Sequence, residues 1–192
     1  IYPLSLTDAL PICIEAWCAD ISSQYQAFHV KEFGSTEEIP APEGFDYDLW
    51  LGPAPPAPYT VDRCTCYGAW HIYDYALGFI AGWGAHPLDI AQWGKGADHT
   101  GPVEYGGGGT LPEKGLYDTV SSWDVMCRYA DGIEMRFMGH RVARPVIEKY
   151  RPPCDHGTTF FGARGWVSVD RRGVHASEDR KSTRLNSSHR IR

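Results

Sequence analysis

The chain has 192 residues, of which 43% are hydrophobic and 22% are charged, and its formal net charge is -6. This length and composition fit one globular domain with a sizeable core and exclude two large domains. An acidic chain without a basic stripe is a poor candidate for binding nucleic acid, and no apolar run approaches the roughly 20 residues that span a membrane.

Six cysteines are spread along the chain, and only Cys64 and Cys66 lie close together in sequence. A zinc site needs about four ligands at suitable spacing. We therefore expect no metal site and unpaired thiols in the core or in loops. A disulfide framework is not expected in a chain long enough to build a core.

The two ends of the chain differ in composition from the middle. Residues 179–192 carry five Lys or Arg side chains and no aromatic residue. Residues 1–12 and 179–192 both resemble translated sequencing-adapter read-through, and a natural disordered basic tail is the alternative for 179–192. We expect the folded domain to span residues 13–178.

The sequence of the first half of the domain predicts few helices or strands. Residues 13–20 alternate weakly and predict a strand, and residues 21–44 predict a long loop. Asp46 and Asp48 precede an apolar triplet that ends at Gly52-Pro53. This pattern predicts a short helical turn followed by a proline-rich extended loop.

One helix is expected after residue 84. Pro87 suits the first turn of a helix, and Gly94 and Gly96 mark its end. Trp93 is expected to lie in the core. The glycine-rich run at 101–112 predicts a loop around a short strand, and it lacks the sequence context of a phosphate-binding loop.

The second half of the domain predicts β-structure. Residues 119–140 predict two strands joined by a turn at 130–132, where Arg128 and Arg136 pair with Asp124 or Glu134. Residues 157–161 and 165–170 predict a second pair. Strands after a single clear helix indicate an α+β fold, with a mainly antiparallel open sheet and a few helices on one face.

Six phrases of the sequence then occur together in a characteristic order. They are DLWLGPAP at 48–55, WGAHPLDIAQWGKG at 83–96, GPVE at 101–104, GLYDT at 115–119, YADG at 129–132 and GWVSV at 165–169. Together they resemble the C-terminal domain of the Gfo/Idh/MocA oxidoreductases, in the form common in planctomycete-type bacteria. The resemblance covers nearly all of residues 40–176.

The resemblance implies a function and a partner domain. Family members hold NAD or NADP on an N-terminal Rossmann domain, and they move a hydride between this cofactor and a sugar, polyol or related carbinol. The glycine-rich nucleotide motif and the family's Glu-Lys-Pro motif are expected upstream of residue 13, so the fragment alone is expected to be inactive. The family's open sheet also implies a homo-oligomer. Localisation stays open between the cytoplasm and export to the periplasm.

The resemblance also implies site residues. The family pattern Asp-x-x-x-His-x-x-Asp places its proton-transferring histidine at His86 and a substrate-holding carboxylate at Asp89, while Gly82 stands where many relatives have aspartate. A histidine suits this task because its ordinary pKa is roughly 6.5. Asp74 is a second candidate for binding substrate hydroxyls. His140 and His156 have no visible partner and are expected at the surface.

Two alternatives remain beside the dehydrogenase. Some relatives use bound NAD to cleave glycosides, and His86 would serve that reaction too. The chain would otherwise be a non-catalytic carbohydrate-binding or oligomerisation module, which the glycine at position 82 favours.

Overall fold

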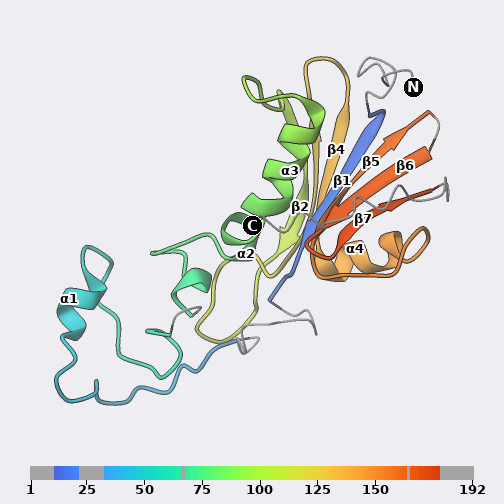
Figure 1. The fold of residues 1–192 in the computed structure, drawn as a ribbon. Helices are drawn as coiled ribbons and strands as arrows, with labels where there is room; N and C mark the ends of the chain where they lie inside the picture. The colour runs from blue at the N-terminus through green and yellow to red at the C-terminus, as the bar shows by residue number, and fades with distance from the viewer. Residues whose placement is uncertain (1–10, 22–32, 66–67, 164, 178–192) are drawn as a thin grey trace, which may run out of the picture.

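The computed structural model describes residues 11–21, 33–65, 68–163 and 165–177. Within these ranges the strands form one open sheet in the order β2-β3-β4-β1-β5-β6-β7 (Figure 1). Their bounds are Cys13–Cys18 for β1, Glu104–Thr110 for β2, Ser122–Arg128 for β3, Glu134–Gly139 for β4, Gly157–Gly162 for β5, Gly165–Asp170 for β6 and Gly173–Ala176 for β7. Only β1 and β4 pair in parallel, so the expected α+β fold with a mainly antiparallel sheet is confirmed.

The central strand β1 is buried on both faces, as expected for a strand with neighbours and covering layers on each side. Ile14 faces helix α3 (Ala85–Lys95), where it clusters with Ala91 and Met135. Trp17 points to the opposite face, where it packs on helix α4 (His140–Ile147). Helix α4 was not expected from the sequence, and it adds a covering layer to the face opposite α3.

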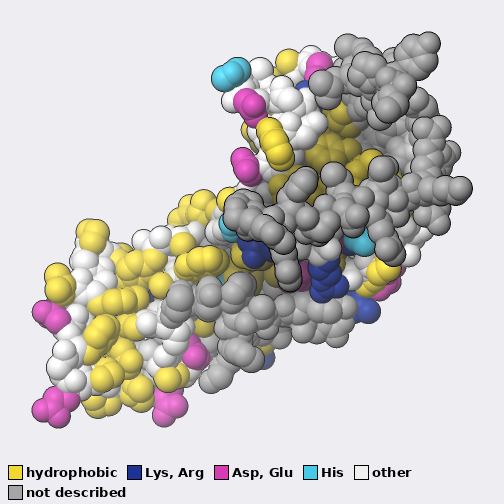
Figure 2. All heavy atoms as spheres, in the orientation of Figure 1, with side chains coloured by type: hydrophobic (Ala, Val, Ile, Leu, Met, Phe, Trp, Pro, Cys, Tyr) yellow, Lys and Arg dark blue, Asp and Glu magenta, His cyan; other side chains and the backbone are white. Residues whose placement is uncertain are grey.

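An extension carries the proline-rich segment away from the sheet (Figure 1). It holds helix α1 (Tyr47–Leu51), whose first turn is capped by Asp46 Oδ1 accepting from the backbone N–H of Leu49 at 2.9 Å. The predicted helical turn after Asp46 is therefore confirmed. Hydrophobic side chains gather on this extension, with acidic groups at its outer edge (Figure 2). Trp50 packs against Tyr75, with their ring centroids 5.0 Å apart.

The predicted hairpin is confirmed as β3 and β4, and the second predicted pair is confirmed as β5 and β6. Arg136 pairs with Asp124 at 2.7 Å and Arg128 with Glu134 at 3.1 Å, as expected. The short strand predicted within the glycine-rich run is confirmed as β2, but it is longer than expected, because all four glycines at 106–109 belong to the strand and not to a loop. A Cβ at Gly107 would lie 2.1 Å from the Asp124 carbonyl oxygen, so glycine permits close pairing there.

Trp93 is exposed over 74% of its surface, and the expected core position is wrong. It lies on the solvent side of α3, opposite the buried Ala91. Gly96 ends α3 in the left-handed conformation, as the sequence predicted, while Gly94 lies inside the helix. In the described ranges, no helix is long and apolar enough to cross a membrane.

Candidate functional site

A tight corner joins helix α2 (Phe79–Gly82) to α3 and brings the start of α3 against the sheet. Gly84 makes this corner possible, because a Cβ there would lie 2.0 Å from the Ile80 carbonyl oxygen and 2.6 Å from the Phe137 ring. The start of α3 is also fixed to β5, since the Thr158 hydroxyl donates to the Pro87 carbonyl oxygen at 2.7 Å. The backbone around residue 86 is therefore held from two sides.

His86 is the second residue of α3, and its side chain is exposed. Its imidazole makes an edge-to-face contact with Trp83, with ring centroids 4.8 Å apart. Asp89 is also exposed and lies three residues further along α3, which places it close to the face of the helix that carries His86. No hydrogen bond or ion pair between described residues joins the two side chains, so both are available to a ligand.

Gly82 ends α2 on the exposed side of the corner. A Cβ at this position would lie 3.1 Å from two atoms of the Trp70 indole, so a side chain fits only after that ring shifts by a few tenths of an ångström. Within the described ranges, no carboxylate is hydrogen-bonded to His86. In the part of the chain that the structure describes, no other residue therefore takes the place of the carboxylate expected at position 82.

Asp74 lies in the exposed loop between the 3-10 helix η2 (Ala69–His71) and α2. The loop is tied down at Tyr73, whose backbone N–H donates to Asp118 at 2.7 Å, and at Tyr75, which packs on Trp50. Among the described residues, no hydrogen bond or ion pair joins Asp74 to His86 or Asp89. The three predicted site residues therefore lie in one half of the domain, and only His86 and Asp89 share an element.

Trp83 is in contact with residues that no sequence pattern connects to it. His156 contacts its indole with ring centroids 5.5 Å apart, and the guanidinium carbon of Arg171 lies 4.6 Å from the ring centroid. His156 Nδ1 is also 2.8 Å from Asp155 Oδ1. His156 precedes β5 and Arg171 lies in the turn between β6 and β7, so these contacts join segments that lie far apart in the sequence.

The expected surface positions of two histidines are wrong. His140 begins α4 and is 2% exposed, and the side chain of His156 is 12% exposed. Burial lowers the pKa of His140, and the hydrogen bond from His156 lowers the pKa of Asp155. His140 directly follows β4 and His156 directly precedes β5, so the sequence alone suggests exposed positions. The structure buries His140 at the start of α4 and covers His156 with Trp83.

The turn that carries Arg171 is rigid because Asp170 holds it. Asp170 Oδ1 accepts from the backbone N–H of Arg172 at 2.6 Å and of Gly173 at 3.1 Å. Its other oxygen pairs with Arg151, and both side chains are almost fully buried. Burial raises the pKa of Asp170, but the hydrogen bonds from Arg151 and the turn outweigh it and leave a pKa of about 2.

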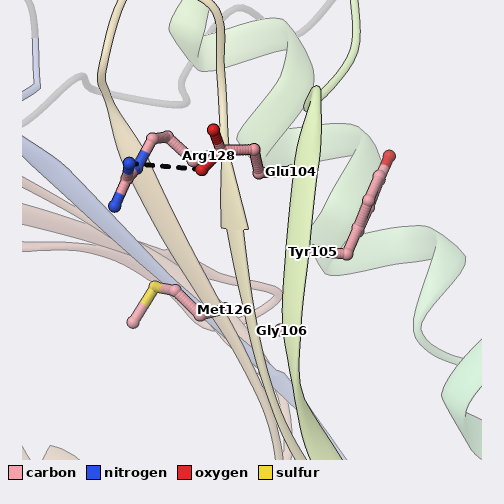
Figure 3. Close-up of a pocket in the computed structure, with 5 residues that line it drawn as sticks. All are labelled: Glu104, Tyr105, Gly106, Met126 and Arg128. Atoms are coloured by element: carbon pink, nitrogen blue, oxygen red, sulfur yellow. Dashed lines mark ion pairs between the residues drawn. The ribbon is translucent and has the colours of Figure 1, made fainter.

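A separate shallow pocket lies at the β2 edge of the sheet (Figure 3). Met126 and Arg128 point to one side of the strands and Tyr105 to the other, towards α3. Arg128 is paired with Glu104 at 3.2 Å. This pocket lacks a histidine or an unpaired carboxylate to carry chemistry. Nor do the described residues contain a group of three or more potential metal ligands.

These features define an α+β domain in which an open, mainly antiparallel sheet supports a helix with an exposed histidine in its first turn. A family model described as "Oxidoreductase family, C-terminal alpha/beta domain" matches residues 20–148. The chain therefore belongs to the Gfo/Idh/MocA oxidoreductase family, through its C-terminal domain, as the sequence phrases predicted. A comparison with curated proteins finds no match.

The matched segment contains His86, Asp89 and Asp74 but not every residue around Trp83. Asp155, His156 and Arg171 lie beyond residue 148, as do strands β5, β6 and β7. The family match therefore covers the α3 candidates, whereas the residues contributed by the last three strands are identified by the structure alone.

Proposed function

We propose that this domain binds the substrate of an NAD(P)-dependent oxidoreductase that moves a hydride between nicotinamide and a sugar, polyol or related carbinol. The observation that carries the proposal is the exposed imidazole of His86, held at the start of α3 in a chain of the oxidoreductase family. His86 would accept the hydroxyl proton when the substrate is oxidised and return it in the reverse direction.

The described residues do not fit a dinucleotide site. Their one glycine-rich run, at 106–109, lies in an antiparallel edge strand and not between a parallel strand and a helix. In the proposal NAD or NADP is bound by a separate nucleotide-binding domain and accepts the hydride there. The part assigned to this chain is confined to binding the substrate and moving its hydroxyl proton.

Asp89 and Asp74 would hold the substrate by accepting hydrogen bonds from its hydroxyl groups. Both carboxylates are exposed, and neither is engaged in an ion pair with another described residue. Asp89 lies near His86 and is assigned to a hydroxyl next to the reacting carbinol, whereas Asp74 is assigned to a more distant part of the substrate.

One observation supports a second candidate, a carbohydrate-binding module without catalysis. His86 lacks a carboxylate partner among the described residues, and position 82 is glycine packed towards Trp70. An imidazole without an orienting carboxylate is a weaker base, so loss of chemistry with retained binding is the consistent alternative. A glycosidase of the same family would use His86 as well. Release of an aglycone would distinguish it from a dehydrogenase, which releases an oxidised substrate.

A homo-oligomer through the open sheet is part of the proposal. The face opposite α3 carries charged side chains of β2, β3 and β4, and Met126 is partly exposed among them. A second copy would bury the part of this face that α4 leaves exposed. Light scattering on the purified protein would test it, and a monomer at all concentrations would contradict it.

The test of the main proposal follows the absorbance of reduced nicotinamide while the complete gene product acts on a panel of sugars and polyols. His86→Asn should lower kcat about a hundredfold or more, because it removes a positioned base. His99→Asn is the matched control, since His99 is exposed beyond α3 and should leave kcat unchanged. Equal activity of wild type and His86→Asn would contradict the proposed role of His86.

A further inference from the structure

Arg171 stacks on the indole of Trp83, which also contacts His86. Its guanidinium carbon lies 4.6 Å from the Trp83 ring centroid, and the His86 ring centroid lies 4.8 Å from the same indole. The Arg171 guanidinium carbon and the His86 ring centroid are therefore no further apart than the sum of these two distances. A single monosaccharide is large enough to touch both.

The Arg171 side chain is exposed and has no carboxylate partner among the described residues. Four other arginines of the domain each pair with an acidic side chain, namely Arg128, Arg136, Arg144 and Arg151. The nearby Asp155 already accepts a hydrogen bond from His156. Arg171 thus differs from these arginines because its charge is positioned and unpaired.

The stacking of Arg171 on Trp83 has a chemical consequence. A guanidinium that lies over an aromatic ring keeps the N–H groups along its edge available. Those N–H groups form a planar fork that matches the two oxygens of a carboxylate. The turn is itself rigid, because Asp170 accepts from two backbone N–H groups that follow Arg171. The fork is therefore held in place before a ligand arrives.

We propose that Arg171 binds the carboxylate of an acidic carbohydrate, such as a uronic or aldonic acid, whose reacting hydroxyl lies at His86. This inference rests on the proposed function and narrows its substrate class. Trp83 contacts both the Arg171 guanidinium and the His86 ring. His156 also packs against the Trp83 indole, and its Nδ1 is hydrogen-bonded to Asp155. A carboxylate is favoured over a phosphate because Arg171 is the one arginine or lysine among the described residues that stacks on the Trp83 ring, and its planar fork matches two carboxylate oxygens.

The experiment measures ligand affinity by NMR or calorimetric titration of the protein with glucuronate, glucose and glucose 6-phosphate. Wild type should bind glucuronate more tightly than the other two ligands, and rising salt should weaken this preference. Arg171→Leu should weaken glucuronate binding about tenfold or more and leave glucose binding unchanged. Arg171→Lys should give an intermediate loss, because it keeps the charge without the planar fork.

Arg172→Leu is the matched control, since it removes the same charge from the neighbouring exposed residue, whose side chain does not stack on Trp83. An equal loss in both variants would overturn the inference, because a general charge effect would then explain the preference. Tighter binding of glucose 6-phosphate than of glucuronate would overturn it in favour of a phosphate site. Equal binding of glucuronate and glucose would overturn the inference while leaving the proposed function standing, whereas binding of no ligand would contradict both.

Discussion

The Thr158 hydroxyl donates a hydrogen bond to the Pro87 carbonyl oxygen at 2.7 Å and so joins strand β5 to the first turn of α3. Pro87 directly follows His86, and both Pro87 and Thr158 are buried. The position of the candidate base thus depends on a hydrogen bond from a residue far along the chain.

Thr158→Val should destabilise the fold by about 1 kcal/mol, because it keeps the shape and removes the hydrogen bond. It should also shift the NMR signals of the His86 ring, since the start of α3 is released. Thr159→Val is the matched control: that hydroxyl is equally buried, but it donates to Ser168 on the opposite face. Urea unfolding and ring NMR should show a similar loss of stability in both variants and a change at His86 only in Thr158→Val.

Two glycines of the α2–α3 corner should respond differently to alanine. Gly82→Ala should change the free energy of unfolding by less than about 1 kcal/mol, because only the Trp70 ring must move slightly. Gly84→Ala should cost about 3 kcal/mol or prevent folding, since its Cβ would overlap a backbone oxygen. Chemical denaturation would measure both, and equal losses would contradict this account of the corner.

Gly82→Asp should raise turnover of the complete gene product if the missing carboxylate limits proton transfer. Gly82→Asn is the control, because it has nearly the same size and cannot carry the charge. A gain in kcat in both variants would point to backbone stiffening, and a gain in neither would show that His86 does not depend on a carboxylate at this position.

The buried His71 should make stability depend on pH. It is fully buried against Phe79 and Tyr117, and burial lowers its pKa from 6.5 to about 4. Between these values the unfolded chain binds a proton that the folded protein does not, so stability falls as the pH drops from about 6.5 towards 4. This loss should reach about 3 kcal/mol, and His140 adds to it with the same sign.

Urea unfolding at a series of pH values would measure this dependence. His71→Leu should flatten it between pH 6.5 and 4, relative to the exposed-site control His99→Ala. Asp170 acts in a lower window, because its stabilisation is present above its ordinary pKa of 3.8 and is lost as the pH falls through about 2. An unchanged slope in His71→Leu would contradict the assignment.

Replacing only one partner of the buried Arg151–Asp170 pair should lower the free energy of unfolding strongly. Asp170→Asn should destabilise the protein by about 3–5 kcal/mol, because it leaves the Arg151 charge buried without a partner. The double variant Arg151→Met with Asp170→Leu should lose less. Glu148→Gln breaks the exposed Arg144–Glu148 pair and should cost about 1 kcal/mol at most. Thermal or urea unfolding of the four proteins would test this order.

Sequence patterns predicted the elements that local signals define. The turn at residues 130–132 and the alternation on either side were enough to place β3 and β4. Pro87 and Gly96 bounded α3 for the same reason, since both residues have strong conformational preferences. Helix α4 was missed because Pro145 lies inside it and its basic residues resemble a surface loop.

Some residues of the candidate site can likewise be predicted from a local motif, and others cannot. His86 and Asp89 follow from a short motif on one helix, and a family pattern can point to them. His156 and Arg171 reach Trp83 only because β5 and the turn after β6 return beside α3, and no local pattern encodes that return. Trp93 was misplaced because the periodicity of a helix does not say which side meets the sheet.

Strand β1 lies between two hairpin systems that do not otherwise touch in the sheet, β2-β3-β4 on one side and β5-β6-β7 on the other. Its partners appear about 120 and 150 residues after it in the chain. During synthesis one edge of β1 therefore stays unpaired until β4 has been made, and the other edge stays unpaired until β5 has been made. We expect slow folding and early aggregation to be governed by this one segment, because pairing across such sequence distances carries a large loop-closure cost.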